Sequence, residues 1–366
     1  MEGFRWSQVG EGATDALFDA DALQERHVGR GEFRGMEFLH VNARRIISEV
    51  ARSSRMPFRH TINVYRGCSH ACTYCFARPT HEYLGLGIGE DFERRIVVKV
   101  NAVERLRAEL AARRWRGEHI AMGTNTDPYQ RCEGKYHLTQ GVVGVLTEAA
   151  NPFSILTKST LVLRDIDLLA EASRRTDVRV NLSIGTLDDR VWKLTEPGTP
   201  PPRARVEAVR KLNEAGVACG VLVAPVLPGL SDGDDQLRSV VGACVGAGAV
   251  SLSAVALHLR PGVREHYLTW LRGVQPALAA ELDRRYRRAY LPKTDQEALS
   301  ARVRAFADGA GMGGAGRRPW RTPQQARSVR GDSVRESPDA TPCPGPEARP
   351  TQLRLGVEAA SGPPPP

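Results

Sequence analysis

The chain has 366 residues, 41% of them hydrophobic, and a formal net charge of +9 at pH 7. This size allows one large domain with extensions, or two domains, and no apolar run approaches the ~20 residues of a membrane-spanning helix. Because the first residues also lack the basic and apolar regions of a signal peptide, we expect a cytoplasmic protein without a membrane segment. The positive charge indicates an anionic partner, and nucleic acid is one candidate.

The first part of the chain, residues 1–57, is a lead-in to the main domain. Within it, residues 36–50 (MEFLHVNARRIISEV) have the pattern of a short amphipathic element. We expect this element to form an N-terminal extension that packs over one end of the main domain.

Residues 58–290 are predicted to form the core domain with its C-terminal cap. Between residues 58 and 260, short apolar runs alternate with amphipathic helical stretches, which predicts six β/α units. The predicted strands are residues 61–66, 119–124, 153–159, 178–186, 217–226 and 249–257. The predicted helices between them are residues 102–114, 140–150, 165–175, 203–216 and 234–248. Near-continuous apolar strands separated by single helices indicate a parallel sheet covered on its faces. Right-handed connections then give a barrel or an open doubly wound sheet, and periodicity alone does not distinguish the two.

Polar or special residues follow the core of each predicted strand. They are Cys68, Thr124–Asp127, Lys158–Ser159, Ser183–Thr186, Pro228–Asp232 and His258–Pro261. In a parallel barrel the active site is built at the C-terminal ends of the strands. The six strand ends therefore predict one shared site.

The last part of the chain is predicted to be a cap followed by a tail. Residues 257–286 are expected to cap the barrel, where His258, Arg260, His266 and Trp270 either face the substrate or pack in the cap. From about residue 307, proline becomes frequent and no apolar period survives. We expect residues 291–366 to be mostly a disordered, proline- and glycine-rich tail.

Three of the seven cysteines lie within eight residues, as Cys68-x3-Cys72-x2-Cys75. In a chain without a secretion signal, such clustering indicates metal ligands or catalytic groups rather than disulfides. One loop can place three thiolates on three corners of an iron–sulfur cube, whose irons commonly take four cysteine ligands. Since no fourth cysteine is near in sequence, one iron would be open to an exogenous ligand.

The alternative is a structural zinc site whose fourth ligand is His70, His81 or Cys132. Zinc sites usually show two paired ligand sets in the sequence, and this sequence has no second pair. The iron–sulfur interpretation is therefore favoured. A further alternative is a protein that binds zinc or an iron–sulfur cluster without catalytic activity and that binds nucleic acid.

The cysteine motif, with Tyr74 in the aromatic place before its last cysteine, resembles the radical SAM superfamily. NVYRGCSHACTYCFAR, TNTDPYQ, ILTKS, NLSIGT, TEPGTPPPRARVEAV and VLVAPVLPG are similar, in that order, to blocks of spore photoproduct lyase and its uncharacterised relatives. The resemblance implies a partial (β/α)6 TIM-like barrel and a [4Fe–4S] cluster whose open iron binds S-adenosylmethionine (SAM). It also implies reductive cleavage of SAM to a 5′-deoxyadenosyl radical that acts on an unknown substrate, with electrons from a donor of flavodoxin or ferredoxin type. A DNA photoproduct lyase-like repair enzyme is the alternative function.

The resemblance also implies roles for individual residues. The cluster ligands would be Cys68, Cys72 and Cys75, and Tyr74 would pack beside the cluster or the adenine. The amino group of SAM would be bound by the strand end that contains Thr124, Asn125, Thr126 and Asp127. Lys158 and Ser183 would bind its carboxylate and ribose.

Each of these polar residues also has a structural interpretation. Asp127 precedes a proline and is suited to starting a turn. Lys158 is compatible with a solvated strand end, and Ser183 with a local hydrogen bond to the backbone. Glu196 and Arg205 are expected to form an ion pair, either over the site or on the surface.

Cys132 lies shortly after the second predicted strand and is a candidate catalytic hydrogen-atom donor. In the lyases the donor cysteine ends the equivalent strand, where this chain has Gly123 and Thr124. That difference argues against true photoproduct lyase activity. Cys219 and Cys244 fall within apolar patterns and are expected in the core.

Overall fold

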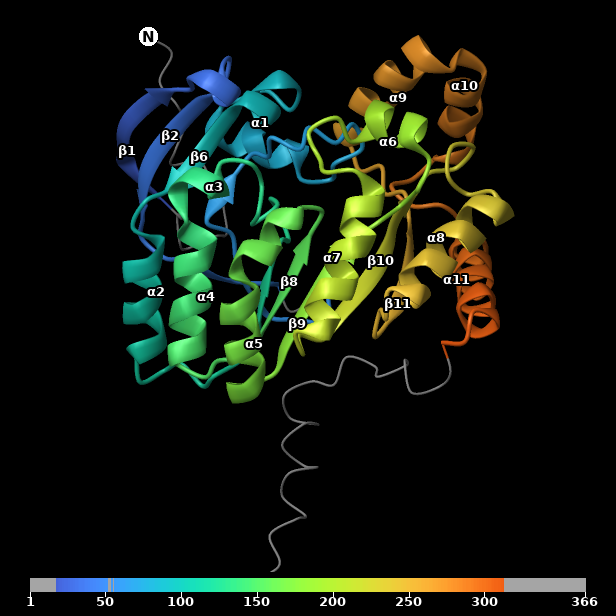
Figure 1. The fold of residues 1–366 in the computed structure, drawn as a ribbon. Helices are drawn as coiled ribbons and strands as arrows, with labels where there is room; N and C mark the ends of the chain where they lie inside the picture. Colours follow the sequence, from blue (N-terminus) through green and yellow to red (C-terminus); the bar gives the residue numbers. More distant parts are fainter. Residues whose placement is uncertain (1–17, 52–53, 55, 313–366) are drawn as a thin grey trace, which may run out of the picture.

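The computed structural model describes residues 18–51, 54 and 56–312, whose arrangement is shown in Figure 1. The largest unit is a seven-stranded sheet with the order β11-β10-β9-β8-β7-β4-β3. Its strands are β3 (Ile47–Glu49), β4 (His60–Ile62), β7 (Ile120–Met122), β8 (Phe153–Thr157), β9 (Val178–Ser183), β10 (Cys219–Val226) and β11 (Leu252–Ala256). β3 is antiparallel to β4, and the six strands from β4 to β11 are parallel to one another.

Helices connect the parallel strands of this sheet. They are α2 (Ala102–Ala111), α3 (Glu133–Tyr136), α4 (Leu138–Glu148), η3 (Thr160–Asp165), α5 (Ile166–Arg175), α6 (Asp189–Thr195), α7 (Pro202–Glu214) and α8 (Asp234–Gly246). Because the strand order from β4 to β11 follows the chain order, right-handed connections place successive helices on the same face. Figure 1 shows α2, α4, α5 and α7 side by side in front of the strands. The predicted partial (β/α)6 barrel is therefore confirmed, and the doubly wound alternative is excluded.

A second sheet precedes and flanks the barrel. Its order is β1-β2-β6-β5, formed by β1 (Phe18–Val28), β2 (Glu37–Ala43), β6 (Arg95–Lys99) and β5 (Tyr65–Arg66). The first predicted strand, residues 61–66, is thus divided between the two sheets, since β4 belongs to the barrel and β5 to the second sheet. The segment between β1 and β2 contains η1 (Gly31–Phe33), and the longer segment between β5 and β6 contains η2 (Arg78–Leu84) and α1 (Glu90–Arg94).

The lead-in differs from its prediction, because residues 36–50 form two strands, β2 and β3, rather than one amphipathic element. Both faces of β2 are covered. Leu39 and Val41 pack with Val97 of β6 in a small core between the strands, whereas Phe38 joins the main core of the barrel. A strand that is buried on both faces lacks the alternation from which strands are predicted.

The predicted cap consists of α9 (Val263–Val274) and α10 (Pro276–Arg285). Their buried residues, among them Tyr267 and Leu271, form an apolar cluster that also includes Cys72 and Tyr74 of the cysteine motif. The cap therefore packs directly on the loop that carries the motif.

The predicted tail, residues 291–366, begins with a helix, α11 (Lys293–Gly309), which packs against β11 and α8. Leu299, Val303 and Ala307 of this helix are buried at four-residue intervals. The prediction missed this short apolar stripe because charged residues surround it. The remainder of the tail, residues 313–366, lies outside the described residues. Among those that are described, no helix combines the length and hydropathy needed to cross a membrane.

Candidate active site

The cysteine motif forms the loop that follows β5. Gly67, with φ +78°, precedes it, and a Cβ at this position would lie 2.8 Å from the Phe92 carbonyl oxygen. This glycine lets the chain turn closely past α1, where the Cys68 amide donates a hydrogen bond to the same carbonyl at 2.9 Å. Cys68 and Cys72 are buried and Cys75 is half-buried, and all three are free thiols.

The three thiols lie in an environment that suits a bound cationic group. Burial raises the pKa of Cys68, and the charges of Asp127 and of the other two cysteines raise it further. Burial likewise raises the pKa of Cys72 and of Cys75. Thiolates are the metal-binding form, so a positive centre between the three sulfurs would compensate a charge that this site otherwise disfavours.

The spacing of the sulfurs favours a cluster over one ion. With Zn–S bonds of about 2.3 Å, the sulfurs of a tetrahedral zinc site are about 3.8 Å apart. Among the described residues, only Glu25, His27 and His40 bring three ligand atoms within 4.8 Å of one another. At least one pair of the three cysteine sulfurs therefore lies more than 4.8 Å apart, which is wider than in a tetrahedral zinc site.

Thr126 and Gln130, which follow β7, hold the cysteine loop by hydrogen bonds to its backbone. Thr126 Oγ1 donates to the Gly67 carbonyl oxygen at 2.6 Å. Gln130 Nε2 donates to the same oxygen at 3.1 Å, and Gln130 Oε1 accepts from the Ser69 amide at 2.9 Å. The buried Gln130, which the sequence analysis missed, thus clamps both sides of Cys68.

Asp127 connects β7, β8 and the cysteine loop. One carboxylate oxygen accepts from the Thr157 hydroxyl at 2.6 Å and from the Tyr129 amide at 2.9 Å. The other accepts from the Lys158 amide at 2.7 Å and lies 3.3 Å from His70 Nδ1. Burial alone would raise the pKa of Asp127, but the charge and hydrogen bond of His70 outweigh it, so the pKa is lowered. The carboxylate is thus supplied with four donors from the protein itself.

The two residues that precede Thr126 in the same strand end lie closer to the surface. Thr124 is half-buried and exchanges hydrogen bonds with Asn63, whose side-chain oxygen also accepts from the Asn125 amide at 3.1 Å. Asn125 is exposed. The structure therefore separates the predicted group into Thr126 and Asp127, which support the loop, and Thr124 and Asn125, which border it.

Lys158 and Ser183 meet at the ends of β8 and β9. Lys158 Nζ donates to Ser183 Oγ at 2.5 Å and to the Ala224 carbonyl oxygen at 3.3 Å. It also lies 5.7 Å from the centre of the Tyr74 ring. These contacts bring three predicted residues together next to the cysteine loop.

The expected Glu196–Arg205 pair is present and buried, with relative exposures of 3% and 1%. Glu196 also accepts a hydrogen bond from the Tyr74 hydroxyl and lies 3.5 Å from Lys158 Nζ. Burial alone would raise the pKa of Glu196, but Arg205 and then Lys158 outweigh it and lower the pKa to about 2. The pair therefore lies over the site, and the surface interpretation is wrong.

A second residue that the sequence analysis missed is Arg78. It is fully buried, and its guanidinium donates to the Cys72 carbonyl oxygen at 2.9 and 3.1 Å and to the Ile88 carbonyl oxygen at 2.9 Å. It also pairs with Glu93. Its place within the block CTYCFAR is a signal, but a sequence does not show that an arginine is buried.

The other candidates lie at different distances from this centre. Cys132 is fully buried in the main core, which also contains Tyr65 and Tyr129 but none of the three motif cysteines. Its catalytic role stays a prediction. Cys219 and Cys244 are buried in the same core, as expected.

The cap residues are divided between packing and the site. His258 stacks on Tyr290 with ring centres 4.0 Å apart, and Trp270 packs on Tyr267 at 5.3 Å. Burial lowers the pKa of His266 to about 4, and the charge of Arg78 adds to this effect. His266 is therefore the cap histidine that lies within electrostatic reach of the cysteine loop. Arg260 is half-buried, and its substrate contact remains untested.

Gly198, in the loop after α6, packs against the cysteine loop so closely that a Cβ would lie 2.1 Å from the Ser69 carbonyl oxygen. Gly198→Ala is therefore expected to displace the loop and to cost about 1–3 kcal/mol of folding free energy, as overpacking does. Thermal unfolding and the iron content after anaerobic reconstitution should both decrease. The matched control is Gly242→Ala in α8, where a Cβ meets no heavy atom within 4 Å. Equal behaviour of the two variants would contradict the proposed contact.

The fold and the site define a class: a partial β/α barrel with three cysteines in one loop between its first and second parallel strands. Residues 62–239 match the family model described as the radical SAM superfamily. An uncharacterized protein of Mycobacterium tuberculosis is 44% identical over 279 residues, which cover 76% of this chain and 82% of that protein. The chain belongs to the radical SAM superfamily, as its motif predicted, and is an enzyme of that class.

Two further similarities are more distant. A radical SAM Nalpha-GlyT isomerase of Pseudomonas phage M6 is 27% identical over 169 residues, which cover 46% of this chain and 33% of that protein. A solved spore photoproduct lyase variant with bound AdoMet and dinucleoside spore photoproduct has a TM-score of 0.54 at 17% identity. The similarity covers 75% of this chain and 79% of the lyase, and it confirms the fold. Membership of this superfamily implies SAM and an iron–sulfur cluster as cofactors.

Proposed function

We propose that Cys68, Cys72 and Cys75 bind a [4Fe–4S] cluster and that the protein uses it to cleave SAM reductively, acting on a substrate that is still unknown. The observation that carries this proposal is the set of three free thiols on one loop, two of them buried and one half-buried, which are not all within 4.8 Å of one another and whose loop is held by Gln130 and Arg78. With three protein ligands, the cluster would keep one iron open to SAM.

The cluster and SAM, when bound, supply a one-electron cleavage that yields a 5′-deoxyadenosyl radical. The residues of this chain bind SAM and orient it. Lys158 carries the charge that suits the carboxylate of SAM, and Ser183 can donate to and accept from the ribose. Thr124 and Asn125, which border the loop, are the proposed contacts to its amino group, whereas Thr126 and Asp127 position the loop and the Lys158 backbone.

The test is anaerobic reconstitution of the full chain with iron and sulfide. We expect about four irons per chain, as in a cubane cluster, and formation of 5′-deoxyadenosine when dithionite and SAM are added. A flavodoxin or ferredoxin should replace dithionite as the electron donor. A chain that acquires the cluster but never cleaves SAM would contradict the proposed activity, and stoichiometric zinc in place of iron would contradict the cluster.

Lys158→Met is expected to raise the KM for SAM about 10- to 100-fold, which corresponds to the 1.5–3 kcal/mol of a hydrogen bond to a charged group. Ser183→Ala should have a smaller effect in the same direction, since it removes a neutral partner. The measurement is the rate of 5′-deoxyadenosine formation against SAM concentration. Lys193→Met, an exposed lysine in α6, is the matched control and should leave KM unchanged. An unchanged KM in Lys158→Met would remove the assigned contact.

A second candidate is an activity on nucleic acid. It is supported by the net charge of +9 and by the fold shared with the lyase that binds a dinucleoside. A lyase-type donor cysteine has no room at Gly123, where φ is +88° and a Cβ would lie 2.0 Å from the Leu156 carbonyl oxygen. We therefore favour a different reaction over photoproduct cleavage. Salt-dependent DNA binding would support a nucleic-acid substrate, and its absence at low salt would remove this candidate.

A further inference from the structure

The β1–β2 pair brings two histidines and a glutamate together in the second sheet. Glu25 and His27 are two residues apart in β1 and so point to the same face. The antiparallel register pairs Glu25 with His40 of β2 and His27 with Phe38. The backbone alone therefore places His40 opposite Glu25 and diagonal to His27 on one face.

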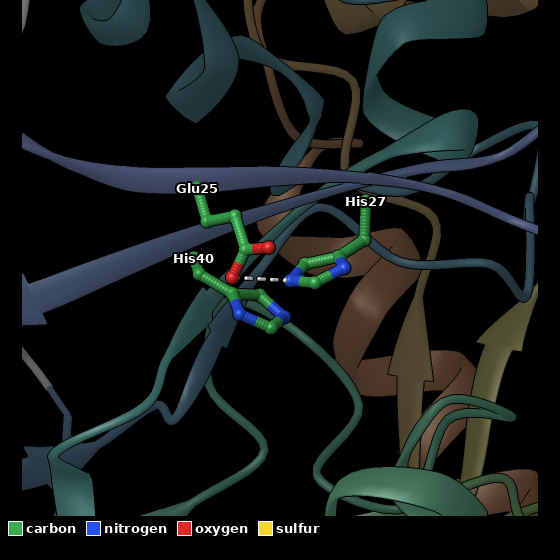
Figure 2. A group of neighbouring side chains, drawn as sticks. All are labelled: Glu25, His27 and His40. Carbon is green, nitrogen blue, oxygen red and sulfur yellow. Dashed lines mark ion pairs between the residues drawn. The ribbon is translucent and has the colours of Figure 1, made fainter.

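The side chains converge as this register requires. Figure 2 shows the Glu25 carboxylate and the two imidazole rings directed toward one another. Their ligand atoms all lie within 4.8 Å of one another, and the ring centres of His27 and His40 are 4.1 Å apart. His27 Nε2 lies 2.9 Å from Glu25 Oε2, close to the separation of about 3.3 Å between nitrogen and oxygen ligands of a tetrahedral zinc ion.

The hydrogen bonding of His27 Nε2 indicates that this nitrogen lacks a partner among the described residues. The atom is buried although the side chain as a whole is one-third exposed, and it makes no hydrogen bond of acceptable geometry. Its contact with Glu25 is thus short enough for a hydrogen bond but does not have the angles of one. A buried nitrogen that is left in this state is unfavourable by itself, and an ion shared with the carboxylate would satisfy both groups.

We propose that Glu25, His27 and His40 form a binding site for one divalent transition-metal ion, of which zinc is the type. Two imidazoles and one carboxylate are a ligand set that zinc and ferrous iron accept. This site is separate from the cysteine loop, and neither its residues nor its strand β1 were predicted from the sequence. It is independent of the function proposed above.

The surroundings supply outer support for one ligand. His40 Nε2 is 2.8 Å from the hydroxyl of Tyr136, at the end of α3. Hydrogen bonds of this kind orient metal-binding imidazoles.

The surroundings also provide an approach to the metal. His27 lines a hollow of about 810 Å³ together with Arg26, Arg30 and Lys135. Three protein ligands leave a coordination position free. Because three of the side chains that line the hollow beside it are basic and one, Glu32, is acidic, water or a small anion is the ligand that fits this position.

The test is a Co²⁺ titration of the full chain after reconstitution with iron and sulfide, under anaerobic conditions. We expect one equivalent to bind with visible bands of nitrogen and oxygen coordination and without a thiolate-to-metal band, which would report the cysteine loop. His27→Ala and His40→Ala should each weaken binding at least about 100-fold, because loss of outer partners alone costs 10- to 100-fold. Glu25→Gln should weaken binding as well and preserves the shape of the side chain.

His137→Asn is the matched control, since His137 is exposed and asparagine tolerates its positive φ. It should bind Co²⁺ as wild type does. The proposal would be overturned if the variant in which both His27 and His40 are replaced still bound Co²⁺ with the affinity of wild type. It would also be overturned if a thiolate-to-metal band appeared. Unchanged thermal midpoints before metal addition show that a loss of binding is not a loss of fold.

Discussion

Cys72→Ala is expected to abolish both the iron–sulfur absorption and 5′-deoxyadenosine formation after reconstitution. Cys72 is the central ligand of the loop, and its carbonyl oxygen is fixed by Arg78. Two remaining thiolates would hold a cubane at only two corners, and cluster irons commonly require four ligands. Cys68→Ala and Cys75→Ala should give the same result, measured as iron and sulfide per chain and as product per hour.

Cys132→Ala serves as the matched control, because it removes a buried cysteine that lies in the main core. It should retain the cluster and the cleavage of SAM. If Cys132 is the hydrogen-atom donor, the variant would still form 5′-deoxyadenosine but would stop converting the substrate. A cluster that persists in all three motif variants would contradict the ligand assignment.

Glu196→Gln is expected to lower the free energy of unfolding by about 3–5 kcal/mol, because it leaves Arg205 and Lys158 without their counter-charge in a buried site. Denaturant unfolding at pH 7 measures this. The folded-state pKa of Glu196 is about 2, below its ordinary 4.5. Its contribution is therefore fully present above pH 4.5 and is lost as the pH falls toward 2, so the difference between wild type and variant should shrink in that range.

The control for this prediction is Glu207→Gln, since Glu207 pairs with Arg210 on the exposed face of α7. An exposed pair contributes little, so this variant should unfold like wild type. The double variant Glu196→Gln/Arg205→Met should recover part of the loss by removing the stranded guanidinium. Equal stability of the two single variants would show that the buried network does not depend on Glu196.

The barrel was predictable because its strands and helices carry strong local patterns. Each predicted strand core of the barrel is present, and the strand ends that share polar residues do meet at one edge, as Lys158 and Ser183 show. The cysteine spacing was informative for a similar reason, since three ligands on one loop need no knowledge of the tertiary fold.

What the sequence did not reveal depends on contacts between distant segments. Gln130 and Arg78 act through the backbone of the cysteine loop, and although both lie in blocks quoted for the family resemblance, a sequence does not show which segment a buried side chain contacts. The role of Asp127 was ambiguous for the same reason, because its donors come from three different segments. β6 was missed since it pairs with a lead-in strand, β2, that was itself not recognised.

The division of residues 60–66 between two sheets has a consequence for engineering. The cysteine loop leaves from β5, which pairs with β6, and β6 pairs in turn with β2. The sequence analysis places the start of the core domain at residue 58. A truncation there would remove β2, which pairs with β6, and would expose an edge of β6, the strand that pairs with β5 just before the cysteine loop. A shortened protein made for expression or directed evolution should therefore keep the barrel together with the sheet formed by β1, β2, β6 and β5.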